Sequence, residues 1–323
     1  MGLLARALLD DYSPKSCMVT QNSSERSTKG LYGGVVALLI AACVWGGAFV
    51  PQRVIAETMG AHTCNAIRYL LAGVIMLPFV WKRGGYTVDN NSTRHSLVLG
   101  FFLFVASALQ QAGLSYTSAG KGGFITGLYM VVTPLLLATF FKASLSLGYW
   151  IGALVAVSGL GLLCLHGVDY ISVGDVLVFG CAVAFAFHIV FADRFLHTTT
   201  PMKLAVGQYL VCGIFSALSA WLFESMVGVD VISLALPLLY MAVVSTVVGY
   251  TLALVGQRFV APEVAAIVLS LEAVFAVFAG RWFLNERMST AQALGCILMF
   301  LGCIVAHSCS RSKLELQKND CDV

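Results

Sequence analysis

Two charged side chains stand inside long apolar runs of this 323-residue chain, and they are the first places to look for chemistry. Glu272 lies about ten residues into its run, and Arg68 lies about one or two helical turns into another. Burying a charge in apolar surroundings is costly unless the charge is paired or neutralised. Glu272 could therefore bind and release a proton, or it could hydrogen-bond a neighbouring helix. Arg68 could bind a ligand carboxylate, pair with Glu57 or Glu286, or extend to the surface.

Neutral polar and aromatic side chains within the apolar runs form a second set of candidates. Amides, phenols and imidazoles suit the recognition of a zwitterion or a sugar, and they also hold helices together. With Arg68, the candidates for substrate binding are Trp45, Gln110, Tyr129, His188, Gln208 and Tyr250. A lone His in an apolar helix, as His188 is, is more often a packing residue than a ligand. It has no His, Cys or carboxylate at metal-ligand spacing, so we predict no metal site and no cofactor.

The composition indicates the surroundings of these residues. Hydrophobic residues make up 59% of the chain and charged residues 11%, and the mean hydropathy is +0.87. Average soluble domains have roughly 45–50% apolar and about 25% charged residues. This chain cannot supply a charged surface, whereas an apolar helix surface suits the acyl chains of a bilayer. We therefore expect an all-α, polytopic membrane protein with the lipid bilayer as a partner. The net charge of +3, without a basic stripe, predicts no nucleic-acid partner.

Ten apolar runs are long enough, at about 20 residues each, to cross a bilayer as helices. The expected spans cover approximately 31–50, 62–81, 96–113, 121–141, 146–165, 174–192, 203–223, 231–255, 262–283 and 289–308. Residues 1–30 and 309–323 are polar and are expected to be tails.

The distribution of Lys and Arg predicts the orientation of these spans. An even number of spans places both tails on one side of the membrane. With the tails inside, 14 of the 19 Lys and Arg residues lie in inner segments and four in outer ones. The positive-inside rule then places both termini in the cytosol, and we expect the plasma (inner) membrane. Lys121 and Glu286 become outer-face charges. Because the helix dipole disfavours a cation at the start of the span 121–141, an anionic substrate or Glu286 could hold Lys121.

An internal repeat divides the chain into two halves, 31–165 and 174–308. When the halves are aligned at their repeated glycines, Trp45 falls on His188, and after a small shift Arg68 falls on Gln208. We name this register the repeat alignment. Each half holds five expected spans, and an odd number forces the second half to enter from the opposite side. The pattern therefore predicts two inverted five-helix repeats, an architecture of many secondary transporters.

Small residues and prolines predict how some spans pack. Spaced seven residues apart on one face, the repeated pairs Gly152 with Gly159 and Gly295 with Gly302 predict close helix contacts. Such faces pack either within one chain or between the two chains of a dimer. The sequence is therefore compatible with a monomer and with a homodimer. Pro134 predicts a bend in the span 121–141 because it removes a backbone hydrogen bond.

Several motifs, in order, resemble a known family. WGGAF at 45–49, RYLLA at 68–72 and GLSYTSAGKGGFI at 113–125, followed by TPL at 133–135, resemble an EamA domain of the drug/metabolite transporter superfamily. LSLEAVF at 269–275 and LNERMS at 284–289 are similar to the end of a second copy. The first copy departs from this pattern with KAS at 142–144, so Glu286 has no acidic counterpart there. The resemblance implies ten spans, two EamA domains and export of small metabolites, often amino acids.

The leading functional hypothesis is a secondary carrier for a small polar metabolite such as an amino acid, with alternating access around a midplane cavity. A channel or facilitator is the alternative, although no ring of charges or filter loop is visible. A membrane enzyme is a weaker one, because no nucleophile and base stand at catalytic spacing. Transport could be coupled to protons, to exchange or to downhill flow, and no Walker motif points to ATP.

Overall fold

The computed structural model describes residues 28–82, 90–117, 119–143, 145–164, 171–225, 232–284 and 289–321. All regular structure within these ranges is helical. The first half consists of α3 (Thr28–Ala56), α4 (Ala61–Lys82), α5 (Asn90–Leu114), α6 (Ala119–Gly127), α7 (Tyr129–Phe141) and α8 (Leu147–Cys164). The second half consists of α9 (Val173–Leu196), α10 (Pro201–Phe223), α11 (Ala235–Leu239), the π-helix η1 (Tyr240–Tyr250), α12 (Thr251–Gln257), α13 (Pro262–Ser270), α14 (Glu272–Leu284) and α15 (Thr290–Cys321).

Eight helical segments in the described ranges are long and apolar enough to cross a membrane. The other two expected spans correspond to α8 and α15, whose apolar stretches Leu147–Leu162 and Thr290–Ala306 are shorter. Many large apolar side chains remain exposed on the outside of the bundle, as suits contact with lipid. Beyond its apolar stretch α15 continues as a helix to Cys321, into the segment expected to be a tail. The chain is thus a multi-pass integral membrane protein.

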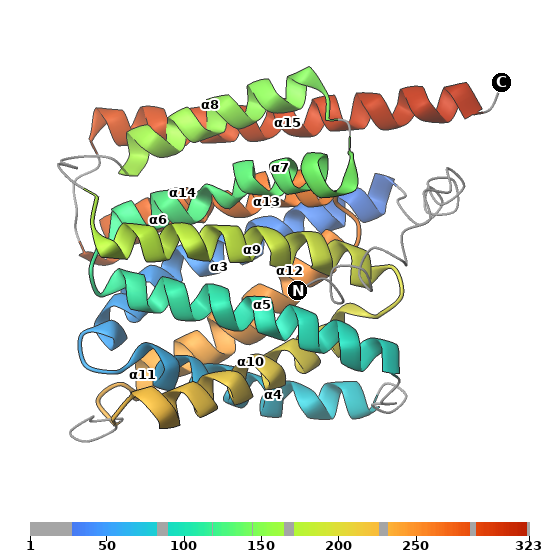
Figure 1. The fold of residues 1–323 in the computed structure, drawn as a ribbon. Helices are drawn as coiled ribbons and strands as arrows, with labels where there is room; N and C mark the ends of the chain where they lie inside the picture. The colour runs from blue at the N-terminus through green and yellow to red at the C-terminus, as the bar shows by residue number, and fades with distance from the viewer. Residues whose placement is uncertain are drawn as a thin grey trace.

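The two halves pack with the pattern of a two-fold relation. In Figure 1 α3 and α9, the first helices of the halves, run in opposite directions across the molecule. Helix α3 packs on η1 and α12, as α9 packs on α5, and α13 and α14 pack on α3 as α6 and α7 pack on α9. Helices α4 and α10, and likewise α8 and α15, pair with their own counterparts. The pattern of helix contacts therefore agrees with the expected inverted repeat.

Both halves contain a span that is broken at the same place. Leu128 separates α6 from α7, and Leu271, its counterpart in the repeat alignment, separates α13 from α14. Pro134, at which a bend is expected, lies within α7, six residues after Leu128. Because Pro134 has no backbone N–H, the carbonyl of Met130 lacks its helical donor. The hydroxyl of Tyr149 lies 3.3 Å from that carbonyl oxygen and 3.2 Å from the carbonyl oxygen of Glu263, and its single hydrogen serves one of them at a time.

One difference between the halves is η1. Its eleven residues are π-helical, whereas the corresponding α5 is an α-helix throughout. Wider π turns leave carbonyl groups available to side chains of other helices. The carbonyl of Ser245 accepts a hydrogen bond from Trp45, and that of Thr246 accepts one from Tyr209. Helix η1 therefore fixes side chains on α3 and α10.

The repeated glycines meet one another within the chain. A Cβ atom on Gly159 would lie 2.6 Å from the carbonyl oxygen of Gly295, and one on Gly152 would lie 2.7 Å from that of Gly302. Only a glycine permits so close an approach of α8 and α15. The expected close packing is confirmed, and its partner is the other repeat.

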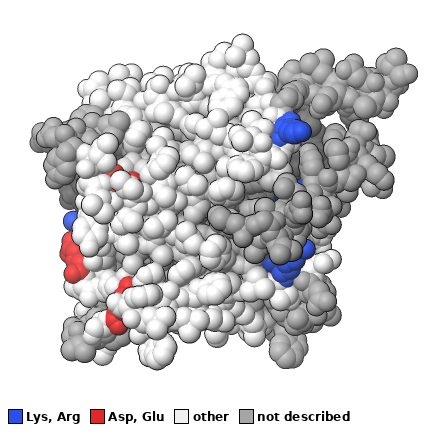
Figure 2. Space-filling model, in the orientation of Figure 1, with Lys and Arg blue, Asp and Glu red and all other residues white. Residues whose placement is uncertain are grey.

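Charged side chains gather at the two ends of the bundle. Figure 2 shows blue Lys and Arg side chains mainly at the right of the view, and red Asp and Glu side chains mainly at the left. The carboxylate of Glu224, which follows α10, accepts hydrogen bonds of 2.8 Å from the backbone N–H groups of His62 and Thr63. These donors lie in the first turn of α4, where helix geometry leaves N–H groups unpaired. Glu224 thus ties α4 to α10.

Candidate functional site

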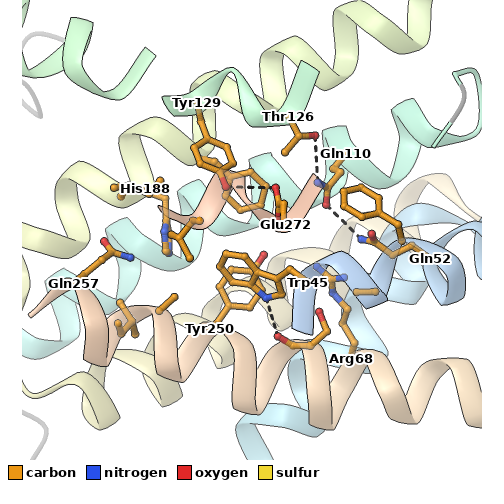
Figure 3. A pocket seen from close by; sticks show the side chains of 18 residues that line it. Trp45, Gln52, Arg68, Gln110, Thr126, Tyr129, His188, Tyr250, Gln257 and Glu272 are labelled. Carbon is orange, nitrogen blue, oxygen red and sulfur yellow. Dashed lines mark hydrogen bonds between the residues drawn. The ribbon is translucent and has the colours of Figure 1, made fainter. Parts of the chain in front are cut away.

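A cavity lies inside the bundle, between helices of both halves. It holds about 660 Å³ of space that no atom fills, part of it open to solvent. The residues around it are Trp45, Ala48, Phe49, Gln52, Arg68, Gln110, Thr126, Tyr129, Phe185, His188, Ile189, Ser245, Tyr250, Ala253, Leu254, Gln257, Leu269 and Glu272. Figure 3 shows the polar side chains on several walls, with aromatic rings between them. Apolar cavities between the helices of a bundle, with a few polar groups pointing inward, are common sites for small molecules.

Arg68 reaches the cavity from α4 and is only 2% exposed. Its Nη2 donates to the hydroxyl groups of Tyr69 and Ser107, the latter at 3.3 Å. Its Nε has no hydrogen-bond partner among the described residues, and no described carboxylate lies within ion-pair distance of the guanidinium. Because a guanidinium keeps its charge even when buried, this site suits an anionic group of a ligand.

Glu272 lines the cavity from the first turn of α14, directly after the break at Leu271. Its side chain is buried, with 5% of the residue exposed, and Tyr129 donates to its Oε1 at 3.4 Å. Tyr129 is the counterpart of Glu272 in the repeat alignment, and it directly follows the other break. The hydrogen bond therefore joins the two broken spans. Among the described residues no cation forms an ion pair with Glu272.

Aromatic side chains form another wall. Trp45 and Tyr250 have ring centroids 4.6 Å apart, and the indole N–H of Trp45 donates to the carbonyl of Ser245 at 3.1 Å. The hydroxyl of Tyr69 lies 3.4 Å from that of Tyr250, which joins this wall to the Arg68 cluster. Large rings held in this way give a ligand apolar contact and little room to move.

Two further groups of polar residues meet the cavity. His188 Nε2 lies 2.8 Å from Gln208 Oε1, and Gln257 lines the cavity near His188 (Figure 3). Elsewhere Gln52 Nε2 donates to Gln110 Oε1 at 3.3 Å, and Gln110 Nε2 donates to the hydroxyl of Thr126 at 3.4 Å. This second group, which we name the glutamine ladder (Gln52, Gln110 and Thr126), links α3, α5 and α6.

The structure brings together nearly all of the residues that the sequence singled out. Trp45, Arg68, Gln110, Tyr129, His188, Tyr250 and Glu272 line one cavity, and Gln208 lies directly behind His188. Their role in substrate binding stays a prediction. The proposed pairing of Arg68 with Glu57 is not formed, because Glu57 pairs with Arg53 at 3.5 Å. Glu286 lies outside the described residues, and of Lys121 only the backbone, in α6, is described.

Sequence reasoning missed several residues of this cavity. Gln52 lies beyond the expected end of the first span, and Gln257 lies beyond the expected end of the eighth. Both are buried because the helices extend further than the most apolar stretch. A buried amide just past an apolar run was the available signal. Thr126 and Phe185 carried none, because their types are common in membrane helices.

Comparison with known proteins agrees with this architecture. The chain matches the EamA-like transporter family twice, over residues 32–165 and 172–307. An uncharacterized transporter of Archaeoglobus fulgidus is 27% identical over 94% of this chain and 98% of its own length. A protein of Escherichia coli K12 named "Probable amino-acid metabolite efflux pump" is 26% identical over 83% of this chain and 92% of its own. The E. coli K12 inner membrane transporter YedA is 22% identical over 83% and 88%.

A solved crystal structure shares the fold, with a TM-score of 0.73 over 86% of this chain and 98% of the other, at 18% sequence identity. The two matched segments coincide with the halves whose broken spans, paired helices and shared cavity were described above. Together they cover most of the chain, so the protein belongs to the EamA-like transporter family, and with it to the drug/metabolite transporter superfamily.

Proposed function

We propose that the chain is a secondary transporter that exports a small polar metabolite, such as an amino acid, by alternating access around the cavity. The observation that supports this proposal most directly is the pair Arg68 and Glu272. They are opposite charges that line one buried cavity, and neither has an ion-pair partner among the described residues. A zwitterion supplies the anion that Arg68 lacks and the cation that Glu272 lacks. Such a ligand offsets two desolvation costs at once.

The arrangement of the repeats supports alternating access. The cavity lies where the repeats meet, as in inverted-repeat transporters in general. The breaks at Leu128 and Leu271 stand next to two of its lining residues, Tyr129 and Glu272. Movement of one repeat against the other would therefore change the cavity directly. The name of the E. coli amino-acid metabolite efflux pump agrees with the direction and the solute class.

Proton coupling is assigned to Glu272. It is the one described acidic residue that lines the cavity, and Tyr129 gives it a single hydrogen bond. A carboxylate in so apolar a place is costly as a charge, and a proton can neutralise it. Proton movement through Glu272 would then supply the driving force.

The orientation is also proposed. Both termini lie in the cytosol and the chain resides in the plasma (inner) membrane. The asymmetry of Lys and Arg residues and the charged ends of Figure 2 support this. YedA, a relative, is named as an inner membrane transporter.

A transport screen tests the proposed function. The purified chain is reconstituted in proteoliposomes and offered a mixed pool of labelled metabolites, with and without a pH gradient. We expect saturable uptake of a zwitterionic solute, increased several-fold by the gradient and strongly weakened in Arg68→Gln. Flux that does not saturate would contradict the carrier and favour a channel. Uptake only of solutes without a carboxylate would contradict the role of Arg68.

A further inference from the structure

The side of the cavity at Arg68 is built from hydroxyl groups that hydrogen-bond one another. The hydroxyl of Tyr69 accepts a hydrogen bond from Arg68 Nη2 and lies 2.6 Å from Ser107 Oγ, where either hydroxyl can donate. Tyr69 also donates to the hydroxyl of Tyr250, at 3.4 Å. Because each hydroxyl group has a single hydrogen, Ser107 donates to Tyr69 when Tyr69 donates to Tyr250. The hydrogen bonds then run in one direction, from Arg68 through Tyr69 to Tyr250.

Tyr250 is the last member of this chain of hydrogen bonds. Its hydroxyl oxygen accepts from Tyr69, and its own hydrogen has no acceptor among the described residues. Tyr250 is 6% exposed and lines the cavity. Hydrogen bonds in a chain polarise one another, so a chain that begins at a permanent cation makes its last hydroxyl group a better donor. The hydrogen of Tyr250 is therefore available to a ligand in the cavity.

Arg68 provides a second donor close to Tyr250. Its Nη2 donates to Tyr69 and Ser107, and its Nε is buried without a partner among the described residues. Nη1 makes no hydrogen bond with a described residue, so it is the nitrogen left for a group in the cavity that Arg68 lines. Because Tyr69 bonds both side chains, Arg68 and Tyr250 lie at one corner of the cavity. This corner donates and does not accept, since a guanidinium has no acceptor and the oxygen of Tyr250 already accepts from Tyr69.

The related residues of the other repeat do not form a second corner of this kind. By the repeat alignment, Tyr209 is the counterpart of Tyr69, and Ser107 is the counterpart of Tyr250. Tyr209 donates to the backbone carbonyl of Thr246 at 3.0 Å, and neither Tyr209 nor Ser107 lines the cavity. Among the described residues, the pair Arg68 and Tyr250 thus has no equivalent across the axis. A ligand anion bound there fixes the orientation of the whole ligand.

We propose that Tyr250 is a second donor to the carboxylate of the substrate, so that Arg68 binds one carboxylate oxygen and Tyr250 the other. This inference rests on the proposed function and assigns one subsite within it. A carboxylate fits two converging donors because both of its oxygens accept. A carboxamide has a donor in place of one acceptor, and that donor is left unpaired at this corner. Tyr250 therefore selects amino acids against their amides.

Competition in proteoliposomes tests this selectivity in the wild-type chain. Uptake of a labelled mixture of the common amino acids is inhibited either by the same unlabelled acids or by the corresponding amides of the α-carboxyl group. The assay is run at about pH 6, where the amines of both competitors are protonated. We expect the amides to inhibit at least about 10-fold more weakly than the acids. Equal inhibition overturns the subsite, and it also contradicts the role of Arg68 in the proposed function.

Tyr250→Phe assigns the selectivity to one hydroxyl group. The variant keeps the ring that packs on Trp45 and loses the donor. The concentration of acids needed for half inhibition should rise roughly 10-fold or more, as for a lost hydrogen bond to a charged group, and that of amides less than about 2-fold. The control is Tyr209→Phe. It also removes a buried tyrosine hydroxyl that is bonded within the protein, but one that does not line the cavity, and it should leave the ratio unchanged.

The outcomes separate the two proposals. Unchanged inhibition by acids in Tyr250→Phe, or an equal loss for acids and amides, overturns the donor role of Tyr250 and leaves the transporter and Arg68 intact. If the wild-type chain takes up none of the amino acids, both proposals are wrong. If Tyr250→Phe does not fold, Tyr69→Phe decides, because it removes the donor that orients the hydroxyl of Tyr250. Inhibition by acids should then weaken several-fold and inhibition by amides should not, and equal weakening of both overturns the subsite.

Discussion

At the residue scale, the cavity holds two charges that the protein leaves for something else to compensate. Arg68 is bonded to hydroxyl groups and Glu272 to a phenol, and no described side chain gives either an ion pair. The sequence predicted both residues because charges are rare in apolar runs. It could not predict that they line one cavity, because this depends on how α4 and α14 are placed. It missed Gln257 because an amide at the end of a span looks like a helix terminus.

Arg68→Gln separates a binding role from a structural one. Losing a charged hydrogen bond to a substrate carboxylate, worth about 1.5–3 kcal/mol, should raise the half-saturating concentration roughly 10- to 100-fold. Removing a buried cation without an ion-pair partner should leave the melting temperature unchanged or raise it. Proteoliposome kinetics and thermal unfolding in detergent measure the two effects. A large fall in melting temperature would assign Arg68 to the structure instead.

Glu272→Gln tests coupling. The amide keeps the size of the side chain and its hydrogen bond with Tyr129 but cannot take up a proton. Accumulation driven by a pH gradient should be lost, while counterflow exchange continues at close to the wild-type rate. The control is Glu57→Gln, at a side chain that is 64% exposed just past the end of α3, and it should accumulate solute normally. Accumulation that survives in Glu272→Gln would contradict a coupling role.

At the element scale, the spans are positioned by breaks and close contacts that composition alone only partly reveals. The glycine spacing predicted tight packing, and α8 and α15 have it. The fourth span is broken at Leu128, which the sequence did not predict, and Pro134, where a bend was predicted, lies within α7. The π-helix η1 had no signal in the sequence. Its hydrogen bonds with Trp45 and Tyr209 form only after distant helices meet.

Two glycine variants test the contact between α8 and α15. In Gly159→Ala the added methyl group would lie 2.6 Å from the carbonyl oxygen of Gly295, so the helices must move apart. We expect a loss of about 1–3 kcal/mol in the free energy of unfolding, from overpacking. In Gly33→Ala the methyl group meets nothing within 4 Å, and stability should be unchanged or slightly higher. Thermal unfolding in detergent compares them, and equal melting temperatures would contradict the contact.

At the scale of the whole molecule, the repeat was the most predictive feature of the sequence. The repeat alignment predicted the halves, and it relates the two breaks and also Tyr129 to Glu272. The family match covers the same two segments. The alignment could not predict which differences between the halves matter for function. Apart from η1, the differences that matter in the cavity are single side chains, and their role depends on which residues of the other half face them.

The proposed cytosolic position of both termini, which rests on the distribution of Lys and Arg, can be checked in cells. Tags fused before Met1 and after Val323 should be protected from protease and antibody in sealed cells, and accessible after permeabilisation. A tag inserted between the seventh and eighth expected spans, which should lie outside, is the control and should be accessible in both conditions. Glycosylation of the native Asn90 or Asn91 would reverse the assignment.

The glutamine ladder has a consequence for the resting state of the transporter. In the repeat alignment Gln52, Gln110 and Thr126 correspond to Phe195, Ala253 and Leu269, so the related end of the bundle has no such hydrogen bonds. If the repeats were identical, closure at one end of the bundle would be equivalent to closure at the other. The equilibrium constant between these two conformations would then be one. Two interhelical hydrogen bonds at about 0.6 kcal/mol each shift that constant roughly eightfold toward closure at the ladder. In the proposed orientation, the transporter without bound solute therefore favours the conformation that is closed on the outer side and open to the cytosol.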